Sequence, residues 1–183
     1  MKNNVREISM FSKFKPDFTF KAFDEVTPEF LLQNGIHGIL SDIDNTLAPY
    51  EIAEPDERIR QWIDALHKSG IKLALISNNH ADRVELFNHT LSLPAYADCG
   101  KPGKKNLIRA LDELGLDAGE CAVLGDQLFT DAFAGKRLGM TAIIVPPIKD
   151  KKTLFFRFKR ALEKPIMKSY ERDIARKAQK SKK

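Results

Sequence analysis

Residues 36–46 of the chain have the sequence IHGILSDIDNT, and this stretch decides the fold. Its first part, residues 36–42, is a short apolar run that predicts a buried strand. Two carboxylates, Asp42 and Asp44, stand at the turn where that strand ends. Open α/β sheets bind their ligands beyond the carboxyl ends of their strands. The residues that follow each apolar run are therefore the first candidates for a functional site.

Further apolar runs alternate with amphipathic segments along the rest of the chain. The apolar runs predict strands at 71–77, 95–100, 121–125 and 141–145. The amphipathic segments predict helices at 56–69, 81–90, 103–114 and 130–138. This alternation predicts an α/β fold in three layers, with a parallel sheet and helices on both of its faces.

Length and composition exclude several classes of protein. The chain has 183 residues, of which 43% are hydrophobic and 30% charged, and this balance argues against a disordered or fibrous protein. The longest stretches without a charged residue have 12 residues, whereas a membrane-spanning helix needs about 20 apolar ones. The N-terminus shows no apolar segment of a signal peptide. With only two cysteines, the expected location is the reducing cytoplasm.

The charge distribution predicts one domain with a basic tail. Residues 1–148 carry a net charge of −5 and should form the domain, with an irregular segment at 1–30 that holds six of the twelve phenylalanines. We expect these phenylalanines to pack against the core. Residues 149–183 carry a net charge of +10. They predict a C-terminal helix that packs on the domain and ends in a basic tail, with an anionic membrane surface or nucleic acid as alternative partners.

Polar residues that suit phosphate chemistry follow four of the predicted strands. Asp42 and Asp44 allow one carboxylate to attack while the other handles a proton. Ser77-Asn78-Asn79 offers a hydroxyl and backbone N–H groups at a helix start. Lys101 supplies a positive charge, and 125–131 (GDQLFTD) adds carboxylates that favour Mg²⁺. Each motif alone also fits an ordinary turn, cap or surface residue, but their joint order points to one site.

These motifs resemble those of a known family. The set DIDNT (42–46), SNN (77–79), KP (101–102) and GDQLFTD (125–131) is similar to the four signature motifs of haloacid dehalogenase superfamily phosphatases. The chain is similar to subfamily IIIA and most closely to its bacterial YqeG family, a closer likeness that residues 16–47 carry. The same branch is similar to phosphatidylglycerophosphate phosphatases. The resemblance implies a Rossmann-like three-layer fold.

The resemblance also implies a role for each motif residue. Asp42 would be the nucleophile that forms an aspartyl-phosphate, and Asp44 the proton donor and later the base. Ser77, Asn78 and Lys101 would bind the phosphoryl group. The remaining implied roles are Mg²⁺ coordination by Asp42, the backbone carbonyl of Asp44 and Asp126, support of Lys101 by Asp131, and shaping of the loop by Asn45 and Thr46.

The spacing of the motifs bears on the substrate. Only 30 residues separate Thr46 from Ser77, and 21 separate Asn79 from Lys101, so neither gap holds a folded cap domain. Capless relatives resemble enzymes that act on large or surface-bound substrates. We therefore expect a Mg²⁺-dependent phosphomonoester hydrolase, with phosphatidylglycerophosphate as the leading substrate, on the inner face of the membrane.

Other functions stay open at this point. One is a phosphatase of soluble sugar or nucleotide phosphates or of a phosphoprotein. Another is a non-catalytic module that docks on RNA, the ribosome or a membrane through its basic tail.

Overall fold

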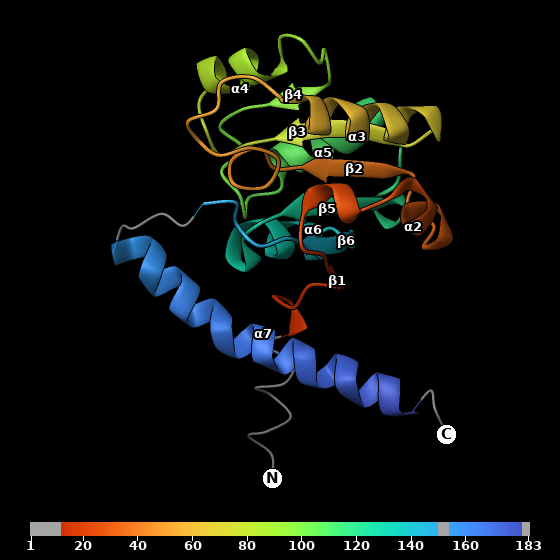
Figure 1. Cartoon of the computed structure of the whole chain (residues 1–183), viewed down its shortest axis with the longest axis vertical. Helices are drawn as coiled ribbons and strands as arrows, with labels where there is room; N and C mark the ends of the chain where they lie inside the picture. Colours follow the sequence, from red (N-terminus) through yellow and green to blue (C-terminus); the bar gives the residue numbers. More distant parts are fainter. Residues whose placement is uncertain (1–11, 150–153, 181–183) are drawn as a thin grey trace.

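The computed structural model describes residues 12–149 and 154–180. Its centre is a six-stranded parallel sheet with the strand order β1-β6-β5-β2-β3-β4 (Figure 1). The strands are β1 (Phe18–Thr19), β2 (Gly38–Ser41), β3 (Lys72–Ile76), β4 (Ala95–Tyr96), β5 (Cys121–Gly125) and β6 (Thr141–Ile144). The two longest strands, β3 and β5, flank β2, so the DIDNT loop leaves the middle of the sheet.

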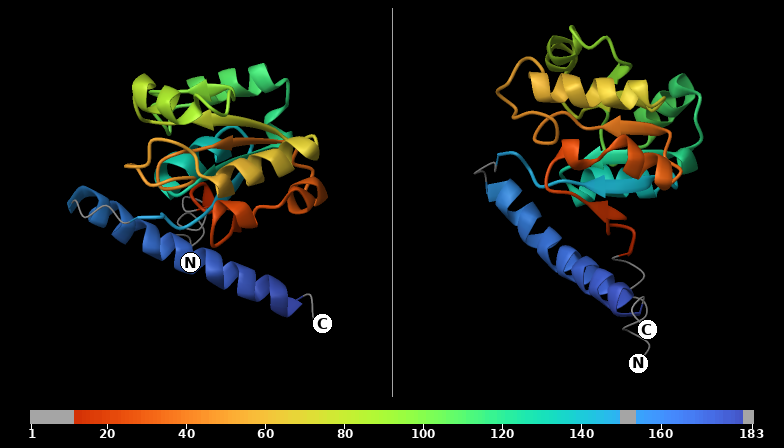
Figure 2. Two further views of the ribbon diagram at one scale, coloured as in Figure 1. Left: turned by 45° about the horizontal axis from the view of Figure 1, so that its top comes forward. Right: turned by 45° about the vertical axis from the view of Figure 1, so that its right-hand side comes forward.

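Helices cover both faces of this sheet, as Figures 1 and 2 show. One face packs against α2 (Pro28–Gln33), α3 (Glu57–Lys68) and α4 (Ala81–Asn88), which contribute the apolar core side chains of that side. The other face packs against α5 (Lys105–Leu114), the π-helical turn η3 (Leu128–Ala132), α6 (Phe133–Lys136) and part of α7 (Leu154–Lys180). Short 3₁₀ turns lie at Phe23–Glu25 (η1) and Ala118–Glu120 (η2).

Alternation along the central strands explains the two cores. In β2, Ile39 packs in the core under α3 and Leu40 in the core under α5, and both are fully buried. In β3 the same alternation places Leu73 on one face and Ala74 on the other. A strand whose two faces are both covered must be apolar throughout. The predicted three-layer α/β fold is therefore confirmed.

Two local predictions differ from the structure. The helix predicted at 130–138 is instead the π-helical turn η3 followed by the short helix α6. The N-terminal segment, predicted as irregular, contains β1, η1 and the start of α2, because Asp17 N–H donates to Ala142 O at 2.8 Å and Phe20 N–H to Ile144 O at 3.1 Å. This pairing adds a parallel edge strand of only two residues, too short to give a periodic pattern.

The N-terminal phenylalanines do pack on the core. Phe23 is 3% exposed and its ring lies 5.3 Å from that of Trp62, while Phe18 and Phe20 both pack edge-on against Phe30. Phe14 contacts two rings on the opposite face. Phe11 lies outside the described residues. The predicted packing of this segment is thus confirmed for the phenylalanines that the structure describes.

The basic tail forms one long helix, α7, that lies along the β1 edge of the domain (Figures 1 and 2). Ile166 is buried in the core under α6, and Glu163 accepts a hydrogen bond from Leu128 N–H at 2.9 Å. Tyr170 Oη donates to Asp17 O at 3.3 Å. Residues 150–153 and the side chains of 154–157 and Arg160, part of the aromatic-basic run, lie outside what the structure describes. Among the described helices, none is long and apolar enough to cross a membrane.

Candidate active site

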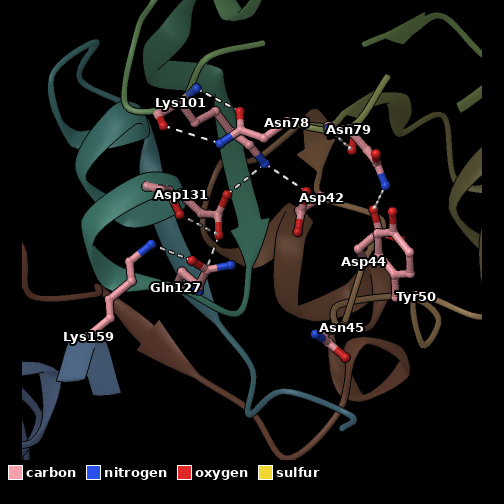
Figure 3. Close-up of a pocket in the computed structure, with 12 residues that line it drawn as sticks. Asp42, Asp44, Asn45, Tyr50, Asn78, Asn79, Lys101, Gln127, Asp131 and Lys159 are labelled. Carbon is pink, nitrogen blue, oxygen red and sulfur yellow. Dashed lines mark hydrogen bonds and ion pairs between the residues drawn. The ribbon is translucent and has the colours of Figure 1, made fainter. Parts of the chain in front are cut away.

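A buried lysine joins two of the predicted site carboxylates. Lys101 Nζ lies 2.8 Å from Asp42 Oδ1 and 2.7 Å from Asp131 Oδ1 (Figure 3). It also donates a hydrogen bond to Ile76 O at 3.0 Å. Burial opposes the charge on Lys101, but the Asp131 and Asp42 carboxylates outweigh burial and raise the pKa of Lys101 above its usual value. The ammonium group therefore stays charged at the point where strands β2, β3 and β5 end.

Three carboxylates converge beside this lysine. Oxygen atoms of Asp42, Asp126 and Asp131 lie within 4.8 Å of one another, and all three residues are buried. The pKa of Asp42 is raised to about 7, chiefly by burial; the Lys101 charge opposes this rise, and the charges of Asp131 and Asp126 add to it. One ammonium group cannot balance three buried carboxylates, and oxygen ligands are what hard divalent cations prefer. The donor set thus fits a divalent metal ion.

Gly125 allows Asp131 to reach this cluster. A Cβ atom on Gly125 would lie 2.4 Å from Asp131 Cβ, a distance that non-bonded carbon atoms do not adopt. Asp131 Oδ2 also accepts hydrogen bonds from Gln127 N–H at 3.1 Å and Thr130 Oγ1 at 3.4 Å. Only glycine fits at the end of β5, because the Asp131 side chain approaches the Gly125 backbone so closely. The turn that follows holds the aspartate in place.

The second carboxylate of DIDNT, Asp44, is held by Asn79 and by Arg83 of α4. Asp44 Oδ1 lies 3.0 Å from Arg83 Nη2, and Asp44 Oδ2 accepts from Asn79 Nδ2 at 3.1 Å. Arg83 was not among the predicted site residues. Its position in the first turn of the helix that follows SNN could have suggested that it lies near the site. Asp44 is thus oriented by the neighbouring strand-helix connection.

The residues of the SNN motif contact both the pocket and the neighbouring loop that carries Lys101. Ser77 is 1% exposed, and its Oγ accepts from Asn79 N–H at 3.0 Å. Both ends of the Asn78 amide bond to the backbone of Lys101, at 2.7 Å to its N–H and 3.2 Å to its carbonyl. Asn78 lines the pocket, but its side chain braces the lysine loop.

Asn45 and Thr46 shape the loop that carries both aspartates. Asn45 has a φ of 66°, in the left-handed region that asparagine tolerates better than most residues. Its N–H donates to Ala48 O at 2.7 Å and closes the turn. Thr46 Oγ1 lies 3.5 Å from Asp42 Oδ2. The loop therefore returns on itself and leaves Asp42 and Asp44 at the sheet edge.

These residues surround one pocket of about 310 Å³ (Figure 3). Of the nine predicted site residues, Asp42, Asp44, Asn45, Ser77, Asn78, Lys101 and Asp131 line it. Tyr50, Gln127, Thr130 and Lys159 also line it and were not predicted. Lys159 comes from α7, where its Nζ donates to Gln127 Oε1. No sequence pattern near the motifs predicts that Lys159 lines the pocket, because its position depends on how α7 packs against the domain.

The two cysteines take no part in this site. Cys99 and Cys121 are both buried, and burial raises the pKa of the Cys121 thiol to about 12. A thiol with so high a pKa is a poor nucleophile at neutral pH. The interpretation of both cysteines as small core residues is in accord with this burial.

Comparison with known proteins places the chain in a known class of hydrolases. A family model described as haloacid dehalogenase-like hydrolase matches residues 10–139, well over half of the chain. The chain therefore belongs to the haloacid dehalogenase-like hydrolase family. Within it, the chain is 35% identical over 159 residues to the "Probable phosphatase YqeG" of Bacillus subtilis (strain 168), an alignment that covers 87% of this chain and 92% of that relative. The resemblance found in the sequence is confirmed.

Solved structures agree with this fold. The cobalt-bound deoxy-D-mannose-octulosonate 8-phosphate phosphatase (YrbI) of Haemophilus influenzae matches with a TM-score of 0.51 and 16% identity, over 77% of this chain and 92% of that chain. A hypothetical protein from Xanthomonas campestris matches with a TM-score of 0.50 and 18% identity, over 69% and 73% of the two chains. At such identities the likeness shows the fold alone.

Proposed function

We propose that this hydrolase is a Mg²⁺-dependent phosphatase that cleaves phosphate monoesters through an aspartyl-phosphate on Asp42. The observation that carries the proposal is the buried Asp42–Lys101–Asp131 ion pair with Asp126 beside it, in a pocket at the carboxyl edge of the sheet. The donor set suits Mg²⁺, which Asp42, Asp126 and the Asp44 carbonyl would hold, with Asp131 supporting Lys101. When bound, the ion supplies positive charge that lets an anionic nucleophile approach an anionic phosphate.

The chain's own groups account for the two steps. The Asp42 carboxylate attacks phosphorus, the bond from phosphorus to the ester oxygen breaks, and Asp44 gives its proton to the leaving oxygen. Asp44 then takes a proton from water, whose oxygen attacks the same phosphorus and releases inorganic phosphate and free Asp42. Lys101 neutralises the phosphoryl oxygens, and the Ser77 hydroxyl donates a hydrogen bond to one of them. These roles use both carboxylates of DIDNT, which lie on the same side of the pocket (Figure 3).

We propose a lipid headgroup monoester, phosphatidylglycerophosphate, as the substrate, cleaved at the inner face of the membrane. In the described residues, the connection between β2 and β3 holds the single helix α3, and that between β3 and β4 the single helix α4. No cap domain therefore covers the pocket in the described part of the chain. A pocket of about 310 Å³ is at the small end for ligand sites and suits a headgroup better than a whole lipid. The basic helix α7 reaches the pocket through Lys159.

Phosphate release from a substrate panel tests this function. We expect release from phosphatidylglycerophosphate in mixed micelles with Mg²⁺, at a kcat/KM well above that on glucose 6-phosphate, AMP or a phosphopeptide. Chelation by EDTA should remove all of it, and added Mg²⁺ should restore it. Release from the soluble esters alone would contradict the lipid substrate and leave a general phosphatase. No release from any ester would favour a docking role on RNA or a membrane.

A further inference from the structure

Exposed apolar side chains lie on the segments that border the pocket. We call five of them the apolar rim: Tyr50, Ile52, Ile148, Phe158 and Leu162. Each is between 45% and 63% exposed, although each has a large hydrophobic side chain. Scattered exposed apolar residues are normal on a soluble protein, but a group of them around one site marks a place of interaction.

Three separate segments bring the apolar rim together. Tyr50, in the loop after β2, lines the pocket itself. Ile148 follows β6, and its N–H donates to the carbonyl of Asn45, another pocket residue, at 3.1 Å. Phe158 stands next to Lys159, which lines the pocket from α7. Figures 1 and 2 show the loop after β2, the segment after β6 and the start of α7 at the same end of the molecule.

Phe158 and Leu162 stay exposed beside the line along which α7 docks. Glu163 is 4% exposed and bonds to Leu128 N–H, and Ile166 is buried three residues later. Phe158, Leu162 and Ile166 follow one another at intervals of four residues, so they lie along one side of the helix. The domain covers Ile166 but leaves Phe158 and Leu162 63% and 47% exposed, at the end of α7 that reaches the pocket through Lys159.

Exposed positive charge lies further along α7, beyond these apolar side chains. Lys164, Lys168, Arg172 and Arg176 are all exposed and follow one another at intervals of four residues. We call these four the basic stripe. A helix that offers apolar side chains together with lysine and arginine suits an anionic bilayer, where the apolar groups enter the interface and the cations meet lipid phosphates. Nucleic acid would use the cations but has less use for aliphatic side chains.

We propose that the apolar rim and the basic stripe together dock the protein on an anionic lipid bilayer, with the pocket mouth toward the headgroups. This inference deepens the proposed function, because it gives a lipid substrate a way to reach the pocket. It rests on the arrangement of exposed residues, so binding can be tested apart from turnover. Lys159 would then stand between the bilayer and the phosphoryl site.

Vesicle sedimentation tests the docking surface. We expect the wild-type chain to bind phosphatidylcholine vesicles that contain phosphatidylglycerol, and to bind more weakly without it or at high salt. The double variant Phe158→Ser/Leu162→Ser should lower the affinity at least about tenfold, since it removes two large apolar side chains from the contact. Its turnover of soluble p-nitrophenyl phosphate should stay within twofold of wild type, which also shows that it folds.

A matched control uses apolar side chains outside the rim. Leu86 on α4 and Ile108 on α5 are 49% and 43% exposed, so Leu86→Ser/Ile108→Ser should leave vesicle binding unchanged. Equal loss in both double variants, no binding by wild type, or retention by RNA in place of vesicles would overturn the proposal. If rim variants lose vesicle binding while wild type cleaves only soluble esters, the docking surface stands and the lipid substrate fails.

A second inference concerns Arg83. Of its three guanidinium nitrogens, Nη2 donates a hydrogen bond to Asp44, whereas Nε and Nη1 are buried without a hydrogen-bond partner among the described residues. The side chain is 11% exposed, and its guanidinium lies 5.2 Å from the centre of the Phe87 ring. Unpaired buried donors lower stability, so such a residue calls for a functional explanation. We infer that Arg83 is a positioning residue that holds the Asp44 carboxylate toward the leaving group.

The leaving group provides a readout that a purely structural role would not affect. An alkyl leaving oxygen needs a proton from Asp44, whereas p-nitrophenolate leaves without one. Arg83→Ala should therefore lower kcat/KM for an alkyl phosphate about tenfold or more and that for p-nitrophenyl phosphate much less. In an Asp44→Asn background, Arg83→Ala should add no further loss. Equal loss on both esters, or losses that simply multiply, would overturn this role; Arg83→Lys should recover part of the activity.

Discussion

Asp42→Asn is expected to abolish turnover, with a fall in kcat of more than about 10³-fold on every ester that the wild type cleaves. The amide keeps the shape of the side chain but is no nucleophile. Phosphate release and the accumulation of acid-stable phosphoprotein in single-turnover samples measure the effect. Asp112→Asn on the exposed face of α5 is the matched control and should keep full activity. Residual turnover above a tenth of wild type would contradict a nucleophilic Asp42.

The same substitution should stabilise the metal-free protein. Burial, with Asp131 and Asp126 adding to it, raises the pKa of Asp42 to about 7, whereas the ordinary value is 3.8. Between these two values the unfolded chain loses the Asp42 proton and the folded chain keeps it, so this group makes the folded state less stable as the pH rises from about 4 to 7. Thermal melts in EDTA should show that Asp42→Asn removes this part of the pH dependence. A variant less stable than wild type at pH 7 would contradict it.

Lys101→Met should cost both activity and stability. It removes the charge that neutralises the phosphoryl group, and we expect kcat/KM to fall at least about 10²-fold. It also leaves Asp42 and Asp131 buried without their common partner, which should lower the free energy of unfolding by about 3 kcal/mol in EDTA. Urea unfolding and steady-state kinetics measure the two effects. Lys105→Met, at an exposed position on α5, controls for the loss of a lysine.

A double variant separates the two effects of Lys101. Lys101→Met/Asp131→Asn removes one of the stranded carboxylates, so it should regain much of the stability while remaining inactive. Full activity of Lys101→Met, or a stability equal to wild type, would contradict a lysine that serves both the fold and the phosphoryl group.

The sequence was sufficient for five of the six strands and for most of the pocket. Four of the predicted strands have clear apolar runs, residues 95–100 give a weaker signal, and the polar residues after these strands meet because parallel strands share one carboxyl edge. The same logic brought Asp42, Lys101 and Asp131 into contact. Such residues are predictable because the fold places them wherever their strand ends.

Other features depend on tertiary contacts that no local pattern encodes. Asn78 was expected to bind the phosphoryl group, yet its amide bonds to the Lys101 backbone, a partner 23 residues away. Arg83 and Lys159 reach the site from helices, and their direction follows from how α4 and α7 pack. Strand β1 forms because the backbones of Asp17 and Phe20 pair with β6. A strand of two residues is too short to show the alternation of apolar and polar residues that predicts a strand.

The long helix α7 has a further consequence for local stability. Among its side chains that the structure describes, only Glu163 and Ile166 are buried. Segments with few buried contacts open at a lower free energy than the core of a domain. Amide hydrogens of α7 should therefore exchange with solvent well before those of β2 and β5, as a separate cooperative unit. Phe158, Lys159 and Leu162 all belong to that unit, so a bilayer that holds α7 down would slow its exchange and keep Lys159 at the pocket.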